Sequence, residues 1–414
     1  MNKERLLERF LRYVQVDTTA REEVDDYPSS RGQLELADLV AEELRAAGAE
    51  EVCRSEFGVV LATVPATANP DAPVVALCAH FDTSPETTGK NVCPQVIRDY
   101  QGGDIDLPGN DTAIVRVEDC PELAELVGST LITTDGTTLL GGDDKAGVAI
   151  IVETVAHLIE QQEIPHGKVR ICLTCDEEIG RGTDHIDLVE LGADVCYTLD
   201  GQGRGELDIE TFSADLATVR FGGVNIHPAI AKDKMVNSIR VAADFMNRLP
   251  ADGCSPETTS QRQGFLHPYT IEGGVGELTL RILLRDFDTA RLADYAETLR
   301  ATAQAVAADH PGSSITVDIR EQYRNMADGL RDEPRAVAFA EAAYKKLCIE
   351  PNLTIVRGGT DGSKLTEMGL PTPNLSSGQH NIHSPLEWAC LEEMEFAGRH
   401  LIELLQLWAE AKKA

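Results

Sequence analysis

Apolar runs alternate with helical patterns through the first half of the chain, which predicts a sheet covered by helices. Short apolar runs typical of strands span residues 59–64, 74–80, 169–175 and 195–199. Residues 145–160 are dominated by Ala, Val, Ile and Leu, as expected of a buried helix, and residues 2–14 form an amphipathic helical stripe. Because strands that alternate with helices usually pair in parallel, we expect an α/β domain with a mostly parallel sheet.

The pattern changes near residue 212. Strand patterns at 214–221, 264–269, 277–286 and 314–319 are interleaved with helical patterns at 235–247 and 289–308. This βαββαβ order is that of a ferredoxin-like α+β unit, and from about residue 334 the chain returns to helix, strand and helix. We therefore predict a catalytic domain formed by residues 1–211 and 325–414, with a small domain inserted at 212–324. The stretch 81–140, rich in Gly and Pro, shows only brief strand signals.

Composition narrows the possible partners and location. The chain carries 37 Lys and Arg against 69 Asp and Glu, a formal net charge of −32. Such a charge repels phosphate backbones and anionic membranes, so neither nucleic acid nor membrane is an expected partner. No apolar run suits a membrane span or an export signal, which favours the cytoplasm. Ten cysteines are scattered through apolar runs, and Cys172 and Cys175 fall on opposite faces of one strand, as reduced packing residues do.

The first candidate site residues lie at the end of one apolar pattern and before the start of another. His80 and Asp82 close the strand pattern at 74–80, and a carboxylate two positions on can orient an imidazole that binds metal. Asp143 and Asp144 lie in a glycine-rich turn before the buried helix. A helix N-cap explains one aspartate, but two buried aspartates repel each other unless a cation neutralises them. The turn lacks the Gly-Lys-Ser/Thr of a P-loop.

Three further groups of candidate site residues follow strand patterns or lie in a loop. Residues 176–178 are three consecutive carboxylates directly after a strand, Asp200 ends the next strand, and His383 lies in a C-terminal loop. Each group alone has an ordinary structural explanation, but all of them fall at the sheet edge where sites form. Two histidines with three or more carboxylates suit zinc, and would also accept cobalt or manganese.

In their order along the chain, these residues resemble the co-catalytic zinc peptidase family that includes carboxypeptidase G, succinyl-diaminopimelate desuccinylase and peptidase T. The longer runs at 80–85, 89–92, 139–147 and 176–181 are similar to the peptidase T branch. The resemblance runs nearly end to end. It implies a zinc-peptidase catalytic domain with an inserted lid, two zinc ions per subunit, and removal of the N-terminal residue from tripeptides by a monomer or homodimer.

The resemblance also implies a role for each residue. One zinc is held by His80 and Asp200 and the other by Glu178 and His383, with Asp143 bridging them; Asp82 supports His80, and Glu177 is the general base for a water between the metals. His227, in the run 223–228, matches the lid histidine that stabilises the oxyanion. Arg285 and Arg357 are candidates for gripping the peptide's carboxylate, although either could pair with a neighbouring Asp.

Some alternatives stay open. Gly142 replaces the alanine of the peptidase T pattern. The last ligand lies in the run 379–383, which contains two histidines; we choose His383, because Glu387 follows it at the family's spacing, with His380 as the alternative. A dipeptidase or an N-acyl amino acid amidohydrolase would use the same metal site, and differs in whether the free amine is recognised, to which Asp144 could contribute. A non-catalytic binding protein would have lost a ligand or the base, and a nucleotide-binding enzyme would need a phosphate motif.

Overall fold

The computed structural model describes residues 1–413, which divide into two compact units. Unit 1 consists of Met1–Ile209, Asp328–Thr354 and the segment from Thr360 onward; unit 2 consists of Glu210–Ala327 and Ile355–Gly359. The sequence pattern places the insertion at 212–324. It does not indicate the second segment of unit 2, because so short a piece carries no periodicity.

An 11-stranded mixed sheet forms the centre of unit 1, in the order β1-β2-β8-β3-β9-β16-β17-β7-β4, with β10 and β15 off this path. The pairs β3–β8, β3–β9 and β9–β16 are parallel, whereas the flanking pairs are antiparallel. The expected parallel pairing is therefore right for the centre, and the short edge strands reverse it. The strands are β1 (Glu50–Arg54), β2 (Val60–Val64), β3 (Val75–His80), β4 (Gln95–Ile97), β7 (Leu131–Thr133), β8 (Val169–Thr174), β9 (Val195–Gln202), β10 (Glu206–Thr211), β15 (Asn352–Val356), β16 (Asn374–His380) and β17 (Trp388–Cys390).

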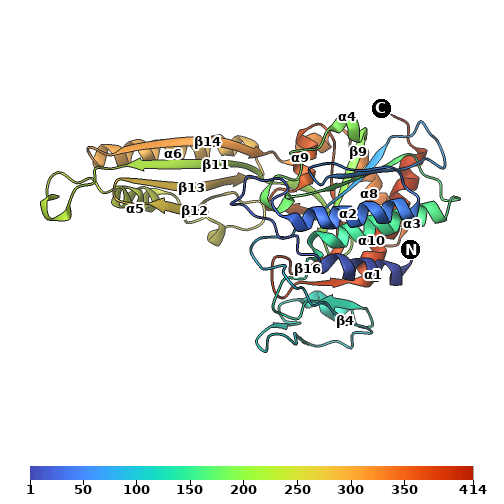
Figure 1. The fold of residues 1–414 in the computed structure, drawn as a ribbon. Coiled ribbons are helices and arrows are strands. Elements are labelled where there is room, and N and C mark those ends of the chain that lie inside the picture. The colour runs from blue at the N-terminus through green and yellow to red at the C-terminus, as the bar shows by residue number, and fades with distance from the viewer. Residues whose placement is uncertain (414) are drawn as a thin grey trace. The chain divides into compact units, whose positions relative to one another are not determined.

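Helices cover both faces of this sheet. Strand β3 contributes alternate residues to two clusters, since Val75, Leu77 and Ala79 pack with α1, α2, α3, α8 and α10, whereas Ala76 and Cys78 pack with α4 and α9. Figure 1 shows α2, α3 and α10 lying side by side over the first face. The helices are α1 (Lys3–Val14), α2 (Arg31–Ala47), α3 (Gly142–Glu160), α4 (Leu188–Leu191), α8 (Arg335–Lys346), α9 (Asp361–Glu367) and α10 (Leu391–Glu410). A short helix, α7 (Met326–Leu330), spans the point in the chain where unit 2 ends and unit 1 resumes.

Two predictions about unit 1 are confirmed in detail. Helix α3 is buried along almost its whole length, although it begins at Gly142 and the backbone of Asp143 and Asp144 is not helical. Cys172 belongs to the cluster under α4 and α9, and Cys175 to the cluster on the other face, so the two thiols point apart. All ten cysteines are free.

The segment between β3 and α3 forms a small subdomain of unit 1. It adds β4 and β7 to the edge of the large sheet and contains a separate two-stranded sheet, β5 (Ile105–Asp106) with β6 (Ile114–Val115). The 3-10 helix Pro121–Glu125 packs on the same core, which includes Leu107, Leu123 and Trp388. The brief strand signals of this stretch are thus real strands of two or three residues.

Unit 2 has the predicted ferredoxin-like order. Its strands β11 (Ser213–Gly222), β12 (Phe265–Gly273), β13 (Glu277–Asp286) and β14 (Ser314–Tyr323) form an antiparallel sheet in the order β12-β13-β11-β14. Helices α5 (Ser238–Arg248) and α6 (Thr289–Asp309) pack on one face around Phe221, Phe245 and Leu299. Alternation of buried and exposed residues along β13 is typical of such a one-sided sheet.

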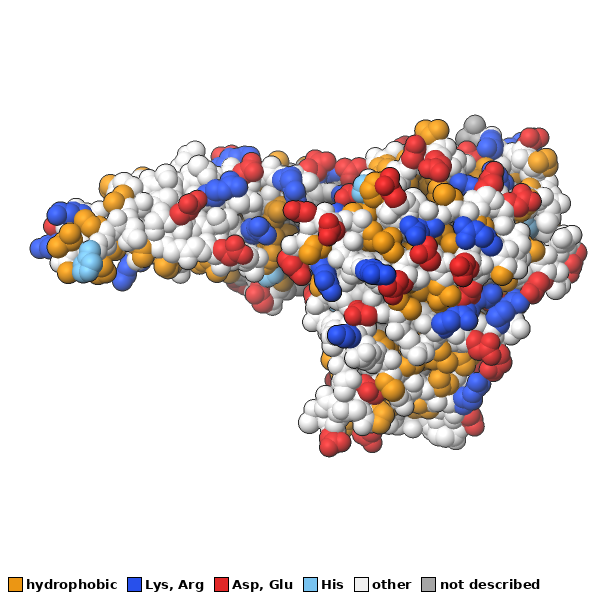
Figure 2. All heavy atoms as spheres, viewed as in Figure 1, with side chains coloured by type: hydrophobic (Ala, Val, Ile, Leu, Met, Phe, Trp, Pro, Cys, Tyr) orange, Lys and Arg blue, Asp and Glu red, His pale blue; other side chains and the backbone are white. Residues whose placement is uncertain are grey.

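The surface is mixed in charge. Figure 2 shows acidic and basic side chains interspersed on the face in view, with no broad basic patch there. Among the described residues, no helix combines the length and the apolar character that a membrane crossing requires.

A buried histidine makes the stability of unit 1 depend on pH. His400 of α10 stacks on Tyr344 of α8 at 3.6 Å between ring centroids, and its Nε2 lies 2.9 Å from the carbonyl oxygen of Ala340. Burial lowers the pKa of His400 to about 4, against about 6.5 in an unfolded chain. The unfolded state therefore binds more protons between these values, and the free energy of unfolding falls as pH drops from about 6.5 to 4.

We expect His400→Gln to flatten this dependence. The glutamine keeps a donor for Ala340 but does not titrate, so the pH slope of the unfolding free energy should decrease by up to ~1.4 kcal/mol per pH unit in that window. Urea unfolding of both chelator-treated proteins at pH 4.5, 5.5 and 7 measures the slope. Equal slopes in the wild type and the variant would contradict the assignment.

Candidate metal centre

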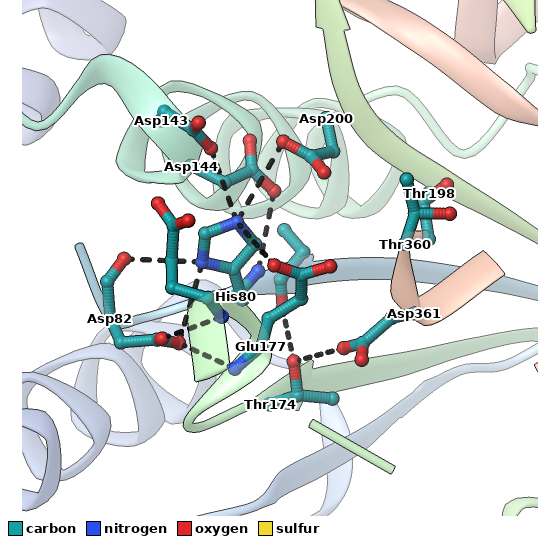
Figure 3. Close-up of polar contacts among 12 residues, drawn as sticks. His80, Asp82, Asp143, Asp144, Thr174, Glu177, Thr198, Asp200, Thr360 and Asp361 are labelled. Carbon is teal, nitrogen blue, oxygen red and sulfur yellow. Dashed lines mark hydrogen bonds and ion pairs between the residues drawn. The ribbon is translucent and has the colours of Figure 1, made fainter. Parts of the chain in front are cut away.

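The predicted site residues of unit 1 meet at the carboxyl ends of its central strands. His80 ends β3, Asp200 lies near the end of β9, and Glu177 with Glu178 follows β8 in a short 3-10 turn. Asp143 lies in the irregular first turn of α3. Because the carboxyl ends of neighbouring parallel strands lie at one edge of a sheet, residues far apart in sequence converge there. Figure 3 shows His80 surrounded by carboxylates from these elements.

The carboxylate of Asp143 lies between two histidines. Its Oδ1 is 3.2 Å from Nε2 of His80, and its Oδ2 is 3.2 Å from Nε2 of His383. Each imidazole also faces a second carboxylate, since Asp200 Oδ1 lies 3.7 Å from His80 Nε2 and Glu178 Oε2 lies 3.0 Å from His383 Nε2. The five residues therefore form two half-sites that share Asp143.

Unsatisfied atoms test whether this arrangement suits a metal. His80 Nε2, Asp143 Oδ1 and Glu178 Oε1 are buried and make no hydrogen bond within residues 1–413, although the first two face each other at 3.2 Å. Buried polar atoms are normally hydrogen-bonded, so three such atoms in one cluster point to an absent partner. Ligand atoms of His80, Asp143 and Glu178 lie within 4.8 Å of one another, as do those of His80, Asp144 and Asp200. This set of nitrogen and carboxylate oxygen donors fits zinc, cobalt or manganese.

The electrostatics of the site agree with a cation. Burial, and then the charge of Asp143, raise the pKa of Glu178 to about 8 and that of Asp200 to about 7. Burial acts to lower the pKa of His383, but Asp143 and Glu178 outweigh it and raise the pKa to about 11. The carboxylates thus hold their charge only beside positive groups, and a bound metal would replace those protons.

Asp82 holds the turn of Glu177 and Glu178 more directly than it holds His80. The hydrogen bond from the His80 ring reaches the backbone oxygen of Asp82, 3.1 Å from Nδ1, and the nearest carboxylate oxygen is 3.4 Å away. The carboxylate itself accepts the backbone N–H groups of Glu177 and Glu178, each at 3.0 Å. The sequence suggests a histidine partner, and the structure adds a cradle for the two glutamates.

Two other buried carboxylates do similar work. Glu387 accepts the backbone N–H groups of Leu140 and Gly141 on Oε2, at 2.7 and 2.8 Å, and that of Asp143 on Oε1 at 3.1 Å. Asp144 points inward and accepts N–H groups from His80 and Gly147. Asp144 is therefore engaged with the backbone. In the sequence analysis Glu387 served only to identify His383 by its spacing. In the structure it holds the turn that carries Asp143.

The structure distinguishes the two C-terminal histidines. His380 stacks on Trp388 at 3.8 Å and its Nε2 lies 2.7 Å from Glu393, so it belongs to a separate buried pair. His383 is the histidine that faces Asp143 and Glu178. Glu177 lies beside the half-site of His80, with Oε2 4.0 Å from His80 Nε2.

The remaining predicted residues belong to unit 2. His227 is exposed, and its Nδ1 accepts the backbone N–H of Ala229 at 3.2 Å. The guanidinium of Arg357 donates to the carbonyls of Gln261 and Gln263 and to the hydroxyl of Thr259, and it lies over the rings of Phe212 and Phe265.

Arg285 differs from Arg357. Within residues 1–413 its buried Nε makes no hydrogen bond, and Nη1 makes a 3.5 Å contact with the Arg357 carbonyl. The guanidinium of Arg357 is thus hydrogen-bonded within its own unit, whereas Arg285 keeps N–H donors without a partner among the described residues.

Several known proteins are similar to this chain. The family model of Peptidase family M20/M25/M40 matches residues 134–407. Relatives named Peptidase T from Geobacillus thermodenitrificans (strain NG80-2) and Bacillus velezensis are 44% and 42% identical over 408 residues, which is 99% of this chain and 99% of each relative.

Solved structures share the fold. A tripeptidase from Staphylococcus aureus and aminopeptidase PepT from Bacillus cereus give TM-scores of 0.78 and 0.76 at 23% identity, covering 99% of this chain and 100% of theirs. A dinuclear metal binding peptidase of the M20 family from Bacillus subtilis gives a TM-score of 0.63 at 14% identity, covering 98% of each chain.

We expect Glu387→Gln to weaken zinc binding by roughly 10- to 100-fold, as loss of a group that orients metal ligands commonly does. Both oxygens of Glu387 accept N–H groups, so the amide must turn an N–H₂ toward at least one of these donors and loosen the turn of Asp143. Competition with a chromophoric zinc chelator measures the affinity.

Glu393→Gln is the matched control, since Glu393 is also buried but its side chain faces His380. We expect this variant to bind zinc like the wild type. An unchanged zinc affinity in Glu387→Gln, with normal thermal stability, would contradict the role given to Glu387.

Proposed function

The chain belongs to Peptidase family M20/M25/M40, and from this premise we propose that it is a two-zinc aminopeptidase that removes the N-terminal residue from tripeptides. The observation that carries the proposal is the shared carboxylate of Asp143, whose two oxygens face two different histidines. Near-full-length identity of 44% to a Peptidase T supports the substrate class.

In this proposal the half-sites become two metal sites. His80 and Asp200 would hold one ion and Glu178 and His383 the other, with Asp143 shared between the two sites. When bound, the pair of divalent ions supplies a water of lowered pKa and polarises the scissile carbonyl. Cobalt or manganese could substitute, because the same donor atoms suit them.

Glu177 is the proposed general base. Its backbone N–H is fixed by Asp82, and its Oε2 lies on the His80 side of the site. From there Oε2 takes a proton from the attacking water and returns it to the departing amine nitrogen.

His227 is proposed to stabilise the oxyanion. With Nδ1 accepting from Ala229, the neutral ring carries its proton on Nε2, which is the atom that donates. In this proposal unit 2 acts as a lid, within one chain or between the chains of a homodimer.

A cytoplasmic location is proposed with the function. Every cysteine is free, as expected in a reducing compartment, and short peptides are soluble substrates that need no membrane or nucleic-acid partner.

The first test is hydrolysis of tri-alanine by zinc-loaded protein. We expect cleavage at the first peptide bond, abolished by a chelator, with little cleavage of N-acetylated tri-alanine or of a dipeptide. Peptide products separated by chromatography provide the measurement. Cleavage of the acetylated peptide would instead assign the protein to the amidohydrolases that share the site, and turnover of the dipeptide alone would make it a dipeptidase.

Glu177→Gln tests the general base in the same assay. The amide keeps the shape of the side chain but cannot accept the proton, so kcat should fall by at least ~100-fold, the usual contribution of a general base, while zinc content stays at the wild-type level. Wild-type kcat in this variant would remove Glu177 from the mechanism.

Arg285 is proposed to bind the C-terminal carboxylate of the peptide, because its guanidinium has unused donors. Arg285→Met should raise KM for tri-alanine by roughly 10- to 100-fold, the equivalent of a charge-assisted hydrogen bond. It should also remove the preference of the wild type for tri-alanine over its C-terminal amide. Steady-state kinetics with both peptides measure this preference.

Arg220→Met is the matched control, since Arg220 is an exposed arginine on β11 of the same sheet. It should keep the wild-type preference. A preference that survives in Arg285→Met would refute the assignment.

A further inference from the structure

The turn that presents Glu177 and Glu178 begins with a backbone conformation that an aspartate rarely adopts. Asp176 has φ 62° and ψ 30°, in the left-handed region that favours glycine. Such a conformation persists where the surrounding contacts impose it. The contacts around Asp176 should therefore reveal what holds the turn.

A segment more than a hundred positions earlier in the chain supplies these contacts. The carboxylate of Asp176 accepts the backbone N–H of Ser29 at 2.7 Å, the Ser29 hydroxyl at 2.5 Å, and the side-chain amide of Gln33 at 2.6 Å. The backbone N–H of Asp176 in turn donates to Oε1 of Gln33 at 3.0 Å. All three residues are buried, and every donor to this carboxylate is neutral.

Gln33 is fitted to Asp176 at both ends of its amide. Nε2 donates to the side-chain carboxylate of Asp176 while Oε1 accepts from its backbone N–H. Neighbouring contacts reinforce the segment, because the hydroxyl of Tyr27 donates to the carbonyl of Cys175 at 2.8 Å. The strand end at Cys175–Asp176 is thus anchored to the start of α2.

The other side of the turn is held by Asp82, which accepts the backbone N–H groups of Glu177 and Glu178. The two anchors enclose the residues whose side chains face His80 and His383, with Glu178 Oε2 3.0 Å from His383 Nε2. A change in the backbone at Asp176 would rotate both glutamates together.

We propose that Gln33 and Ser29 are positioning residues of the metal centre, which act through Asp176 to aim Glu177 and Glu178. The inference rests on the proposed function for the roles of the two glutamates. Gln33 and Ser29 touch neither the candidate ligand atoms nor the base, and their effect is transmitted by the Asp176 backbone.

A swap of polar groups tests the proposal. In Gln33→Glu, a carboxylate faces the carboxylate of Asp176, so two acceptors repel each other. In Asp176→Asn, an amide faces the amide of Gln33, so two donors can meet. Each single variant therefore loses one hydrogen bond of the pair. In the double variant the glutamate accepts from both the asparagine amide and the backbone N–H, which restores the pairing with one buried charge.

We expect each single variant to lower kcat on tri-alanine by at least ~10-fold with KM within about 2-fold of wild type, and to weaken zinc binding by ~10-fold or more. The double variant should recover kcat and zinc affinity to within about 3-fold of wild type. Such a recovery would show that residues 33 and 176 are energetically coupled. Losses that multiply in the double variant, or single variants equal to wild type, would overturn the proposal.

Two controls separate positioning from folding and from the proposed function. His400→Gln perturbs a buried histidine far along the chain, and should leave zinc binding unchanged even where its melting temperature falls. If a single variant does not fold, Ser29→Ala replaces it. It removes the hydroxyl that donates to Asp176 and accepts from the backbone N–H of Arg21 and from Gln33 Nε2, leaves the Gln33 pairing with Asp176 in place, and should give a smaller loss of zinc affinity.

The zinc isotherms also separate the two hypotheses. Rescue of zinc binding without tri-alanine turnover in the wild type would support positioning and refute the peptidase assignment. Turnover in the wild type without rescue would support the peptidase assignment and refute positioning.

Discussion

The sharing of the Asp143 carboxylate between His80 and His383 is the contact on which the rest of the site depends. It brings together groups from the start of α3, the end of β3 and the loop after β16, and it concentrates negative charge where water is largely excluded. Buried carboxylates repel one another and resist ionisation unless a positive group faces them. The orphaned atoms on His80, Asp143 and Glu178 mark where that positive charge belongs.

Backbone N–H groups hold the ligand-bearing turns around this charge. These turns are too irregular to satisfy their own donors, and carboxylates that do not face the shared centre accept them instead. Asp82 takes the N–H groups of Glu177 and Glu178, and Glu387 takes those around Asp143. Each such carboxylate fixes the direction of a neighbouring ligand, so the geometry of the centre is set before any ion arrives.

The two arginines of unit 2 also differ in whether their donors are already hydrogen-bonded. The guanidinium of Arg357 is used up by carbonyls and a hydroxyl of its own unit, whereas the buried Nε of Arg285 has no hydrogen bond. A partly buried guanidinium whose Nε has no hydrogen bond is suited to an anion, because desolvation strengthens the attraction. The antiparallel sheet beneath it, with helices on one face, gives such a group a rigid support.

The sequence by itself determined the central strands β2, β3, β8 and β9, the helices α1 and α3, the ferredoxin-like order of the insertion and the residues at the ends of the central strands, because hydrophobic periodicity and its interruptions are local signals. It could not determine the antiparallel edges, whose strands β4, β7 and β17 are too short for periodicity. It favoured His383 over His380 only through the family's spacing to Glu387, without showing what either ring contacts, and it could not link Gln33 to Asp176. Those outcomes depend on packing between residues distant in the chain, where no local pattern records the partner, and only the tertiary structure decided them.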